Sequence, residues 1–296
     1  MAVPHFEQRL WLQYAINNME GITASSAQRC RKMRIDSVQM AVVKDNKEAA
    51  LEKAAKQVRS CRGADLVILP EMWPIGFMSF DRYFEEAEEG EGTTLSAMRS
   101  LAREIGVHLH TGSFVEKEGG RYYNSSYLLS PSGETLANYR KIHLFGYNSR
   151  ETQLLTPGEG VTVVETELGR MGLATCFDLR FPELFRVMAD RGAEMFLVCS
   201  AWPYPRLEHW LMFNRVRAIE NQCFLVSANA VGPNKGGGFT GHSMIVDPWG
   251  SILASCGDEE TVISTTVGMD RVHGARKEFP GLAGRVDWLR SVCDRE

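Results

Sequence analysis

A cysteine stands where an apolar strand is expected to give way to a turn and then a helix. Met171 to Thr175 form the apolar run, Cys176 ends it, and Pro182 follows at a position typical of the first turn of a helix. A side chain at such a junction is exposed, and the backbone N–H groups of the turn point outward beside it, where they can hold a developing oxyanion. The position favours a nucleophile, although a buried structural cysteine is an equal alternative.

Two charged residues follow other predicted strands. Glu71 comes after the apolar run of residues 65–69, between a proline and a Met-Trp pair that would leave its carboxylate poorly solvated. Such a carboxylate takes up a proton more readily, as a general base must. Lys141 ends a strand predicted over residues 134–141. Taken singly, each is typical of a surface charge facing water, but strand ends in this order would place both residues and Cys176 at one rim of the same fold.

The elements that must position these residues follow an α/β pattern. From Ile35 onward, short apolar runs alternate with segments of helical periodicity, which is typical of layered sheets and helices. A helix is predicted over residues 46–61 with Asn46 as its N-cap, and another ends at Gly106. Further helices are predicted over 182–192 and 206–221, and strands over 35–43, 65–69, two pairs around Gly119-Gly120 and around Pro131 to Gly133, 161–166, 171–175, 195–200, 223–230, 242–247, 251–255 and 261–267. Two similar halves of this kind predict an α/β fold, a four-layer αββα sandwich of two mixed sheets with outer helices.

The composition narrows the possible partners. The 296 residues carry 33 Lys and Arg against 37 Asp and Glu, a formal net charge of −4, so no broad basic surface is expected for nucleic acid or for a membrane. The longest nearly apolar stretches span about eight residues, far below the roughly 20 that cross a bilayer. Seven cysteines without a C-x-x-C pair argue against a disulfide framework and a zinc site. We expect a cytoplasmic protein in which residues 1–33 are an N-terminal extension and residues 34–296 form one domain that includes the C-terminal tail.

Three segments resemble the signature regions of the nitrilase superfamily, the carbon-nitrogen hydrolases: Pro70-Glu71, Tyr139 to Leu144, and Thr175 to Glu183. One such segment would be weak evidence, but three in the right order are specific. The resemblance extends from about Ile35 to the strand near Val267 and leaves out the first 33 residues and the tail. It makes residues 34–296 a predicted carbon-nitrogen hydrolase domain.

The resemblance implies a role for each residue that matches the family pattern. Cys176 would be the nucleophile, Glu71 the general base and acid, and Lys141 the cation that stabilises the tetrahedral intermediate. A further glutamate, which positions the substrate amide in this family, falls at Glu151. The backbone N–H of Phe177 would help to hold the oxyanion. The resemblance also implies an αββα sandwich, no metal, no organic cofactor, and a homodimer or higher homo-oligomer.

Several functions fit these residues. The leading interpretation is a cysteine amidase that converts a small-molecule carboxamide to a carboxylate and ammonia through a thioester. A nitrilase, an N-acyl or carbamoyl hydrolase of the same superfamily, or an acyl transferase are alternatives. True nitrilases tend to carry Trp-Glu after the nucleophile, whereas Phe177-Asp178 follow here, which favours the amidase branch. A non-catalytic oligomeric scaffold is a further alternative, and the intact Glu71, Lys141 and Cys176 argue against it.

The substrate is expected to carry a carboxylate. Arg180 lies four residues after the nucleophile, where a guanidinium could hold a carboxylate through two parallel hydrogen bonds. With Phe177 and Trp202 as further substrate contacts, we predict an ω-amide of a short dicarboxylic or 2-oxo acid, in line with a resemblance to the ω-amidase branch. Alternatively, Arg180 pairs with Asp178 or Glu183 and only braces the turn.

Other patterns carry weaker predictions. His108 and His110 face one side of a strand, but no third metal ligand is evident nearby. The run from Gly236 to Gly238 lacks the ending of a phosphate loop and is interpreted as a loop at the rim of the pocket. Asp178 is expected to be a buried partner of a basic group or amide. The aromatic residues Trp202, Tyr204 and Trp210 suit a dimer interface, together with the helix that starts at Pro182, or a pocket wall.

Overall fold

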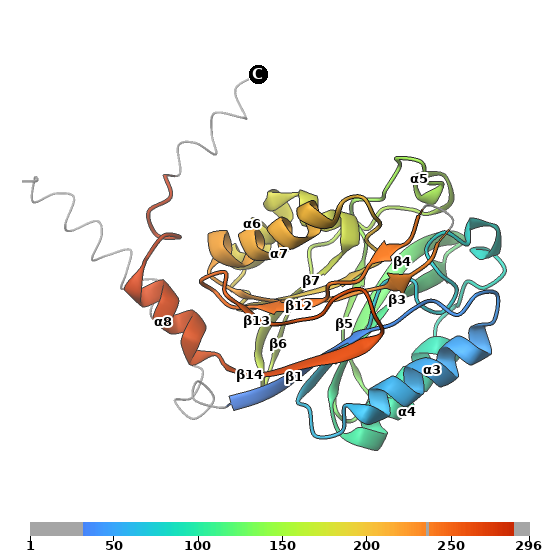
Figure 1. Ribbon diagram of the computed structural model, residues 1–296, viewed down its shortest axis with the longest axis horizontal. Helices are drawn as coiled ribbons and strands as arrows, with labels where there is room; N and C mark the ends of the chain where they lie inside the picture. The colour runs from blue at the N-terminus through green and yellow to red at the C-terminus, as the bar shows by residue number, and fades with distance from the viewer. Residues whose placement is uncertain (1–31, 235–236, 287–296) are drawn as a thin grey trace, which may run out of the picture.

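Two six-stranded mixed sheets form the centre of the molecule (Figure 1). The computed structural model describes residues 32–234 and 237–286, so the predicted N-terminal extension lies almost entirely outside the described residues. In strand order, the first sheet contains β14 (Thr261–Gly268), β1 (Lys32–Gln39), β2 (Leu66–Ile68), β3 (His108–Glu118), β4 (Arg121–Leu129) and β5 (Thr135–Arg140). The second contains β13 (Ile252–Ser255), β12 (Met244–Val246), β9 (Phe224–Asn229), β8 (Met195–Ser200), β7 (Gly169–Thr175) and β6 (Val163–Thr166).

The two sheets share one plan of pairing. In the first, β1, β2 and β3 are parallel to their neighbours within this group, and the outer strands pair antiparallel. In the second, β7, β8 and β9 form the parallel centre. Parallel strands end at the same edge of a sheet. The residues that follow β2 therefore lie at one edge of the first sheet, and those that follow β7 and β8 lie together at one edge of the second.

Helices cover the outer face of each sheet. On the first sheet lie α3 (Lys47–Ser60) and α4 (Thr93–Ile105), and on the second lie α6 (Pro182–Asp190) and α7 (Leu207–Asn221) (Figure 1). The cap of α3 is as predicted, since the Asn46 side chain accepts a hydrogen bond from the backbone N–H of Ala49. Gly106 ends α4 with φ of 70°, a left-handed conformation that favours glycine. The predicted four-layer αββα sandwich is confirmed.

The core between the sheets is built largely from strands that are apolar on both faces. Ile35, Ile68, Leu173, Leu197 and Val226 meet there, and all five side chains are fully buried. Strands of this kind read as continuous apolar runs because one face packs on the other sheet and the opposite face packs on helices. The sequence pattern therefore marked the central strands clearly.

Some elements differ from the prediction. The first strand ends at Gln39, short of the predicted residue 43, and the chain then makes only an isolated bridge at Ala41. Three short features were not predicted: α5 (Glu151–Leu154), the strand pair β10 (Val231–Gly232) and β11 (Phe239–Thr240), and the polar helix α8 (Asp270–Glu278). Such elements are too short or too polar to show a hydrophobic period. No helix among the described residues is long and apolar enough to cross a membrane.

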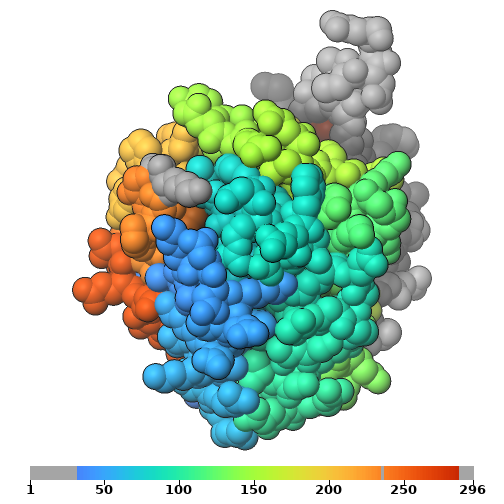
Figure 2. Space-filling view, turned by 90° about the vertical axis from the view of Figure 1, so that its right-hand side faces the viewer, coloured from blue at the N-terminus to red at the C-terminus, as the bar shows by residue number. Residues whose placement is uncertain are grey.

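Figure 2 shows the face of the molecule that carries α3 and α4. The light-green segment around α5 lies along the upper edge of this face. In Figure 1 the same segment lies at the end of the sandwich opposite α8. The candidate site is formed where this segment meets the ends of the central strands.

Candidate active site

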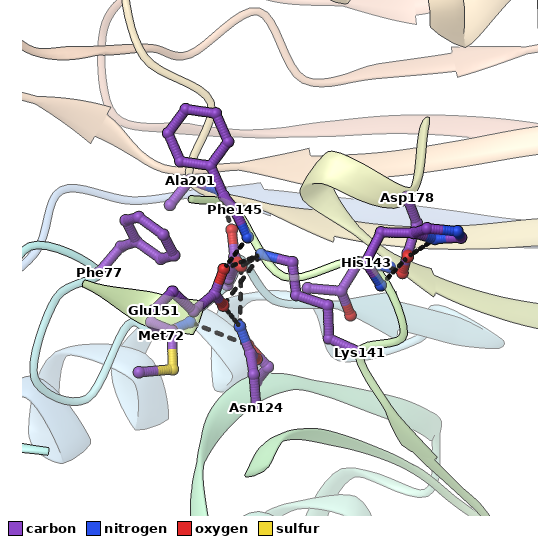
Figure 3. A network of polar contacts seen from close by, with 12 residues as sticks. Met72, Phe77, Asn124, Lys141, His143, Phe145, Glu151, Asp178 and Ala201 are labelled. Carbon is purple, nitrogen blue, oxygen red and sulfur yellow. Dashed lines mark hydrogen bonds and ion pairs between the residues drawn. The ribbon is translucent and has the colours of Figure 1, made fainter. Parts of the chain in front are cut away.

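Three charged side chains meet in the interior at the ends of the strands. Lys141 follows β5, and its Nζ lies 2.8 Å from Oε1 of Glu71 and 3.0 Å from both carboxylate oxygens of Glu151. All three side chains are fully buried. Figure 3 shows the Lys141 side chain directed toward Glu151. The structure thus brings together three of the four residues to which the sequence assigned catalytic roles, and Lys141 is not the solvated charge that a strand-end lysine usually is.

Burial and charge act on this cluster in opposite directions. Burial by itself lowers the pKa of Lys141, but the carboxylates of Glu151 and Glu71 outweigh it and raise that pKa well above its ordinary value. Burial also raises the pKa of Glu151, and the nearby charge of Glu71 adds to this effect while Lys141 opposes it. The lysine is therefore held as an ammonium ion between two acids.

Asn124, a residue that the sequence analysis did not single out, joins the two acids. Its Nδ2 donates to Oε1 of Glu71 and to Oε1 of Glu151, both at 2.9 Å. Backbone N–H groups complete the arrangement, since Ala201 donates to Oε2 of Glu71 at 2.9 Å and Phe145 donates to Oε2 of Glu151 at 2.6 Å (Figure 3). The orientation of each carboxylate is therefore fixed by several donors. Asn124 lies inside β4, away from any strand end, so its position carried no signal of function.

The loop that carries Glu71 is pressed against β3. The backbone carbonyl of Pro70 accepts from the N–H of Ser113 at 3.1 Å, and the N–H of Met72 donates to the hydroxyl of the same serine at 3.1 Å. Gly112 has φ of 65°, and a Cβ there would lie 2.1 Å from the Pro70 carbonyl oxygen. Glycine is therefore required at this position for the loop to approach so closely.

Cys176 starts a short 3-10 turn, Cys176–Arg180, directly after β7. Its φ is 48°, a left-handed conformation that is unusual for cysteine and that occurs in sharp strand-to-turn junctions. Burial raises the pKa of the thiol, and the charge of Glu71 raises it further while Lys141 lowers it. The thiol is therefore protonated at neutral pH, and a base must remove its proton before it can attack.

The turn after Cys176 is tied to the end of β5 by Asp178. One oxygen of this buried carboxylate accepts from the backbone N–H of Thr175 at 2.8 Å and from the hydroxyl of Tyr139 at 2.6 Å. The other oxygen accepts from the backbone N–H of His143 at 3.1 Å and lies 2.7 Å from Nδ1 of the same histidine (Figure 3). Asp178 is thus a buried partner of amides and of a basic side chain, as predicted.

A cavity of about 350 Å³ opens above Cys176. Phe177, Arg180 and Trp202, the three residues predicted to contact substrate, all line it. Trp202 is almost fully buried and belongs to this wall, and Trp210 is fully buried beneath it, so neither side chain is free to form a dimer surface. The remaining lining residues are Phe77, Met78, Phe145, Tyr147, Asn148, Ala201, Pro203, Tyr204, Pro205, Arg206, Asn234 and Phe239.

The guanidinium of Arg180 faces this cavity. It lies 4.9 Å above the ring of Trp202 and 3.1 Å from Nδ1 of His209. Within the part of the chain that the structure describes, no carboxylate forms an ion pair with it. The alternative in which Arg180 pairs with Asp178 or Glu183 is therefore not what the structure shows.

The two histidines considered as a metal pair lie elsewhere. His108 and His110 are buried in β3, and His110 accepts a hydrogen bond from the N–H of Gly112 on Nδ1. Burial lowers the pKa of His110 to about 3, so this side chain is neutral. Among residues 32–234 and 237–286, no group of three or more His, Cys, Asp or Glu side chains is placed to hold a metal ion. Part of the predicted glycine loop, Gly236, lies outside the described residues.

Known proteins resemble this chain in sequence and in fold. The family model described as carbon-nitrogen hydrolase matches residues 34–277, which extends beyond the expected end near Val267 to include most of α8. The 2-oxoglutaramate amidase of Paenarthrobacter nicotinovorans is 38% identical over 230 residues, 75% of this chain and 78% of that protein.

Solved structures match the fold. Nit3 of Saccharomyces cerevisiae, a member of branch 10 of the nitrilase superfamily, aligns with a TM-score of 0.80 at 28% identity, covering 87% of this chain and 97% of that one. A variant of the amidase from Nesterenkonia sp. AN1, with the acetamide moiety of fluoroacetamide bound to its active-site cysteine, aligns with a TM-score of 0.73 at 27% identity, covering 84% and 95%. The chain therefore belongs to the carbon-nitrogen hydrolase family, as an amidase of the nitrilase superfamily.

Proposed function

We propose that this chain hydrolyses ω-amides of short dicarboxylic or 2-oxo acids to the acid and ammonia, with Cys176 as nucleophile. The observation that carries the proposal is the buried cluster of Glu71, Lys141 and Glu151 beside a protonated thiol at the base of a small cavity. A base, a cation and a thiol close together are what amide hydrolysis requires. The name of the Paenarthrobacter nicotinovorans relative, 2-oxoglutaramate amidase, supports the substrate class.

In the acylation half, Glu71 takes the thiol proton while the sulfur of Cys176 attacks the amide carbon. The developing oxyanion is held by the ammonium of Lys141 and the backbone N–H of Phe177, each worth about 3 kcal/mol in donors of this kind. When the C–N bond breaks, Glu71 returns its proton to the nitrogen and ammonia leaves. A thioester with Cys176 remains. The acetamide group bound to the active-site cysteine of the Nesterenkonia amidase variant supports a cysteine as the nucleophile.

In the deacylation half, water attacks the thioester. Glu71 takes a proton from the water, and the oxyanion returns to the same donors. The C–S bond breaks, the thiol recovers its proton from Glu71, and the carboxylic acid is released. Glu151 positions Lys141 throughout and accepts a hydrogen bond from the amide nitrogen of the substrate.

The acid end of the substrate is bound by Arg180. Its guanidinium faces the cavity with no acidic partner among the described residues, so a substrate carboxylate would satisfy its charge. Trp202 and Phe177 form the apolar walls between the two ends. This arrangement suits a short chain with an amide at one end and a carboxylate at the other.

The test is ammonia release from a panel of amides and nitriles of the same chain length. Wild-type protein is expected to act on glutaramate and 2-oxoglutaramate, and Cys176→Ala is expected to lose at least a thousandfold in rate because the nucleophile is gone. Cys256→Ala, which removes a half-buried thiol after β13, is the matched control. Retention of more than about a tenth of the activity by Cys176→Ala would refute the assignment, as would turnover of nitriles alone.

We also propose a homodimer that pairs the outer faces of α6 and α7. Four apolar side chains on these helices, Val187, Met212, Val216 and Ile219, are 38–60% exposed. On α7 the last three are spaced at i, i+4 and i+7 and so share one face, which a second copy of this chain would cover. Light scattering should give twice 33.2 kDa for the wild type, and Ile219→Glu should shift the mass toward the monomer. A wild-type monomer at micromolar concentration would refute the pairing.

We propose a cytoplasmic location for this protein. The five cysteines in the described residues are all free thiols, which fits the reducing compartment that the sequence predicts. The proposed chemistry needs a small-molecule amide as its partner, and the proposed dimer needs a second copy of this chain.

A further inference from the structure

Two arginines face the same cavity. Arg180 and Arg206 both line it, and none of the described residues that line it is acidic. Burial lowers the pKa of Arg180, and the neighbouring positive charge of Arg206 lowers it further. Because both arginines line one cavity, an anion bound between them would relieve the repulsion of their positive charges.

The backbone of Arg206 is fixed to the wall of the cavity. Its carbonyl accepts from Nε1 of Trp202 at 2.8 Å, directly before α7 begins. The guanidinium lies 5.7 Å from the ring of Phe145 and 5.3 Å from the ring of Tyr147, both of which line the same cavity. No ion pair joins Arg206 to a carboxylate within the described part of the chain. Its charge thus faces the space where the acid end of a substrate would lie.

The second arginine affects which ligands the cavity excludes. One guanidinium is enough to hold a carboxylate by a bidentate contact, and a second one nearby disfavours any positive group attached beside that carboxylate. The α-ammonium of an amino acid is such a group, whereas a methylene or a 2-oxo group is not. None of the described lining residues offers a carboxylate to pair with an ammonium ion at this position.

We propose, resting on the function above, that Arg206 is a specificity-determining residue that directs the cavity toward ω-amides of 2-oxo and unsubstituted dicarboxylic acids and against those of 2-amino acids. Arg180 holds the carboxylate, and Arg206 both strengthens that contact and repels an α-ammonium group. Glutamine and glutaramate differ only in this ammonium group, so they report on Arg206 directly.

The experiment measures binding without turnover. In a Cys176→Ala background, calorimetry compares glutaramate with L-glutamine, first with Arg206 present and then in Arg206→Met. The background protein is expected to bind glutaramate at least tenfold more tightly than glutamine. Arg206→Met should weaken the binding of glutaramate about tenfold, or about 1.4 kcal/mol, and should affect the binding of glutamine much less. The ratio of the two affinities should therefore become smaller.

Three controls separate charge from packing. Arg121→Met removes a positive charge at the exposed start of β4 and should change neither affinity. Arg206→Lys keeps the positive charge and should keep most of the preference for glutaramate over glutamine. Arg206→Gln supplies a second neutral variant if the methionine variant folds poorly. Equal weakening of both ligands by the neutral variants would show a packing role and overturn the inference, as would an unchanged ratio.

The outcome is independent of the proposed chemistry. Failure of the wild type to release ammonia from any amide would refute the proposed function, while the binding ratio would still decide the role of Arg206. Absence of glutaramate binding to the Cys176→Ala protein would overturn the role of Arg206 even if the wild type hydrolyses neutral amides.

Discussion

Asp178 links the end of β5, which carries Lys141, to the turn that carries Cys176. We predict that Asp178→Asn will destabilise the fold and slow the reaction. One carboxylate oxygen accepts from the N–H of Thr175 and the other from the N–H of His143. An amide offers an acceptor on one side only, so whichever way the new side chain turns, one of these backbone N–H groups faces an –NH₂ group and loses its acceptor.

The magnitude follows from that lost acceptor. A buried donor left without a partner costs about 1–3 kcal/mol. The Tyr139 hydroxyl can rotate to accept from the new amide, so it limits the loss and does not add to it. We expect the free energy of unfolding to fall by about 2 kcal/mol. A shift of the Cys176 turn relative to Lys141 by about 1 Å would lower kcat about a hundredfold.

Urea unfolding followed by circular dichroism measures the first effect, and steady-state ammonia release measures the second. Asp258→Asn makes the same chemical change on an exposed loop and should stay within about 0.5 kcal/mol of the wild type. Binding of glutaramate should change less than kcat, because Asp178 does not line the cavity. Wild-type stability together with a wild-type kcat in Asp178→Asn would refute the reasoning.

Two further predictions concern single side chains. Arg180→Lys keeps the charge but loses the planar fork, so KM should rise about tenfold for glutaramate and change little for butyramide; equal losses on both would mean that Arg180 only braces the turn. Glu116 is held by Arg140, Ser125 and Tyr127, which outweigh burial and lower its pKa below the ordinary 4.5. The contribution of the ionised Glu116 to the free energy of unfolding is fully present above pH 4.5 and is lost as the pH falls through the lowered pKa. In urea unfolding, the difference in stability between wild type and Glu116→Gln should therefore be widest near neutral pH and should narrow in acid. A difference that is independent of pH would contradict this.

The sequence located the residues that occupy strand ends. Glu71 and Cys176 each follow an apolar run typical of a buried strand, Lys141 follows the mixed strand β5, and topology brings these ends together. The resemblance added Glu151, which no local pattern marks, because the helix that starts there has only four residues. The fold was predictable for a related reason, since the central strands β2, β8 and β9 are mostly apolar and the outer helices α4 and α6 each bury one apolar face.

Asn124 and Arg206 could not be found in this way. Asn124 lies within a strand whose other residues are an arginine, serines, tyrosines and leucines, so it has the appearance of an ordinary sheet residue. Its role depends on which two acids lie opposite, and this is a property of the three-dimensional arrangement. Arg206 lies in a loop rich in proline and tyrosine, where an arginine is usually exposed, and only the shared cavity relates it to Arg180.

The buried cluster shows why the amide of Asn124 matters beyond its hydrogen bonds. Two acids and one ammonium ion leave the cluster with an excess of negative charge when both acids are ionised, and burial makes that charge costly. Asn124 shares one –NH₂ group between the acids and adds no charge, so the ammonium ion stays equidistant from both oxygens of Glu151 and in contact with Glu71. A lysine at position 124 would neutralise the excess and make Glu71 a weaker base for the thiol, whereas an aspartate would add a third negative charge to a space that already holds two. A neutral donor is therefore the side chain that keeps Glu71 able to accept the proton of Cys176 while its geometry remains fixed.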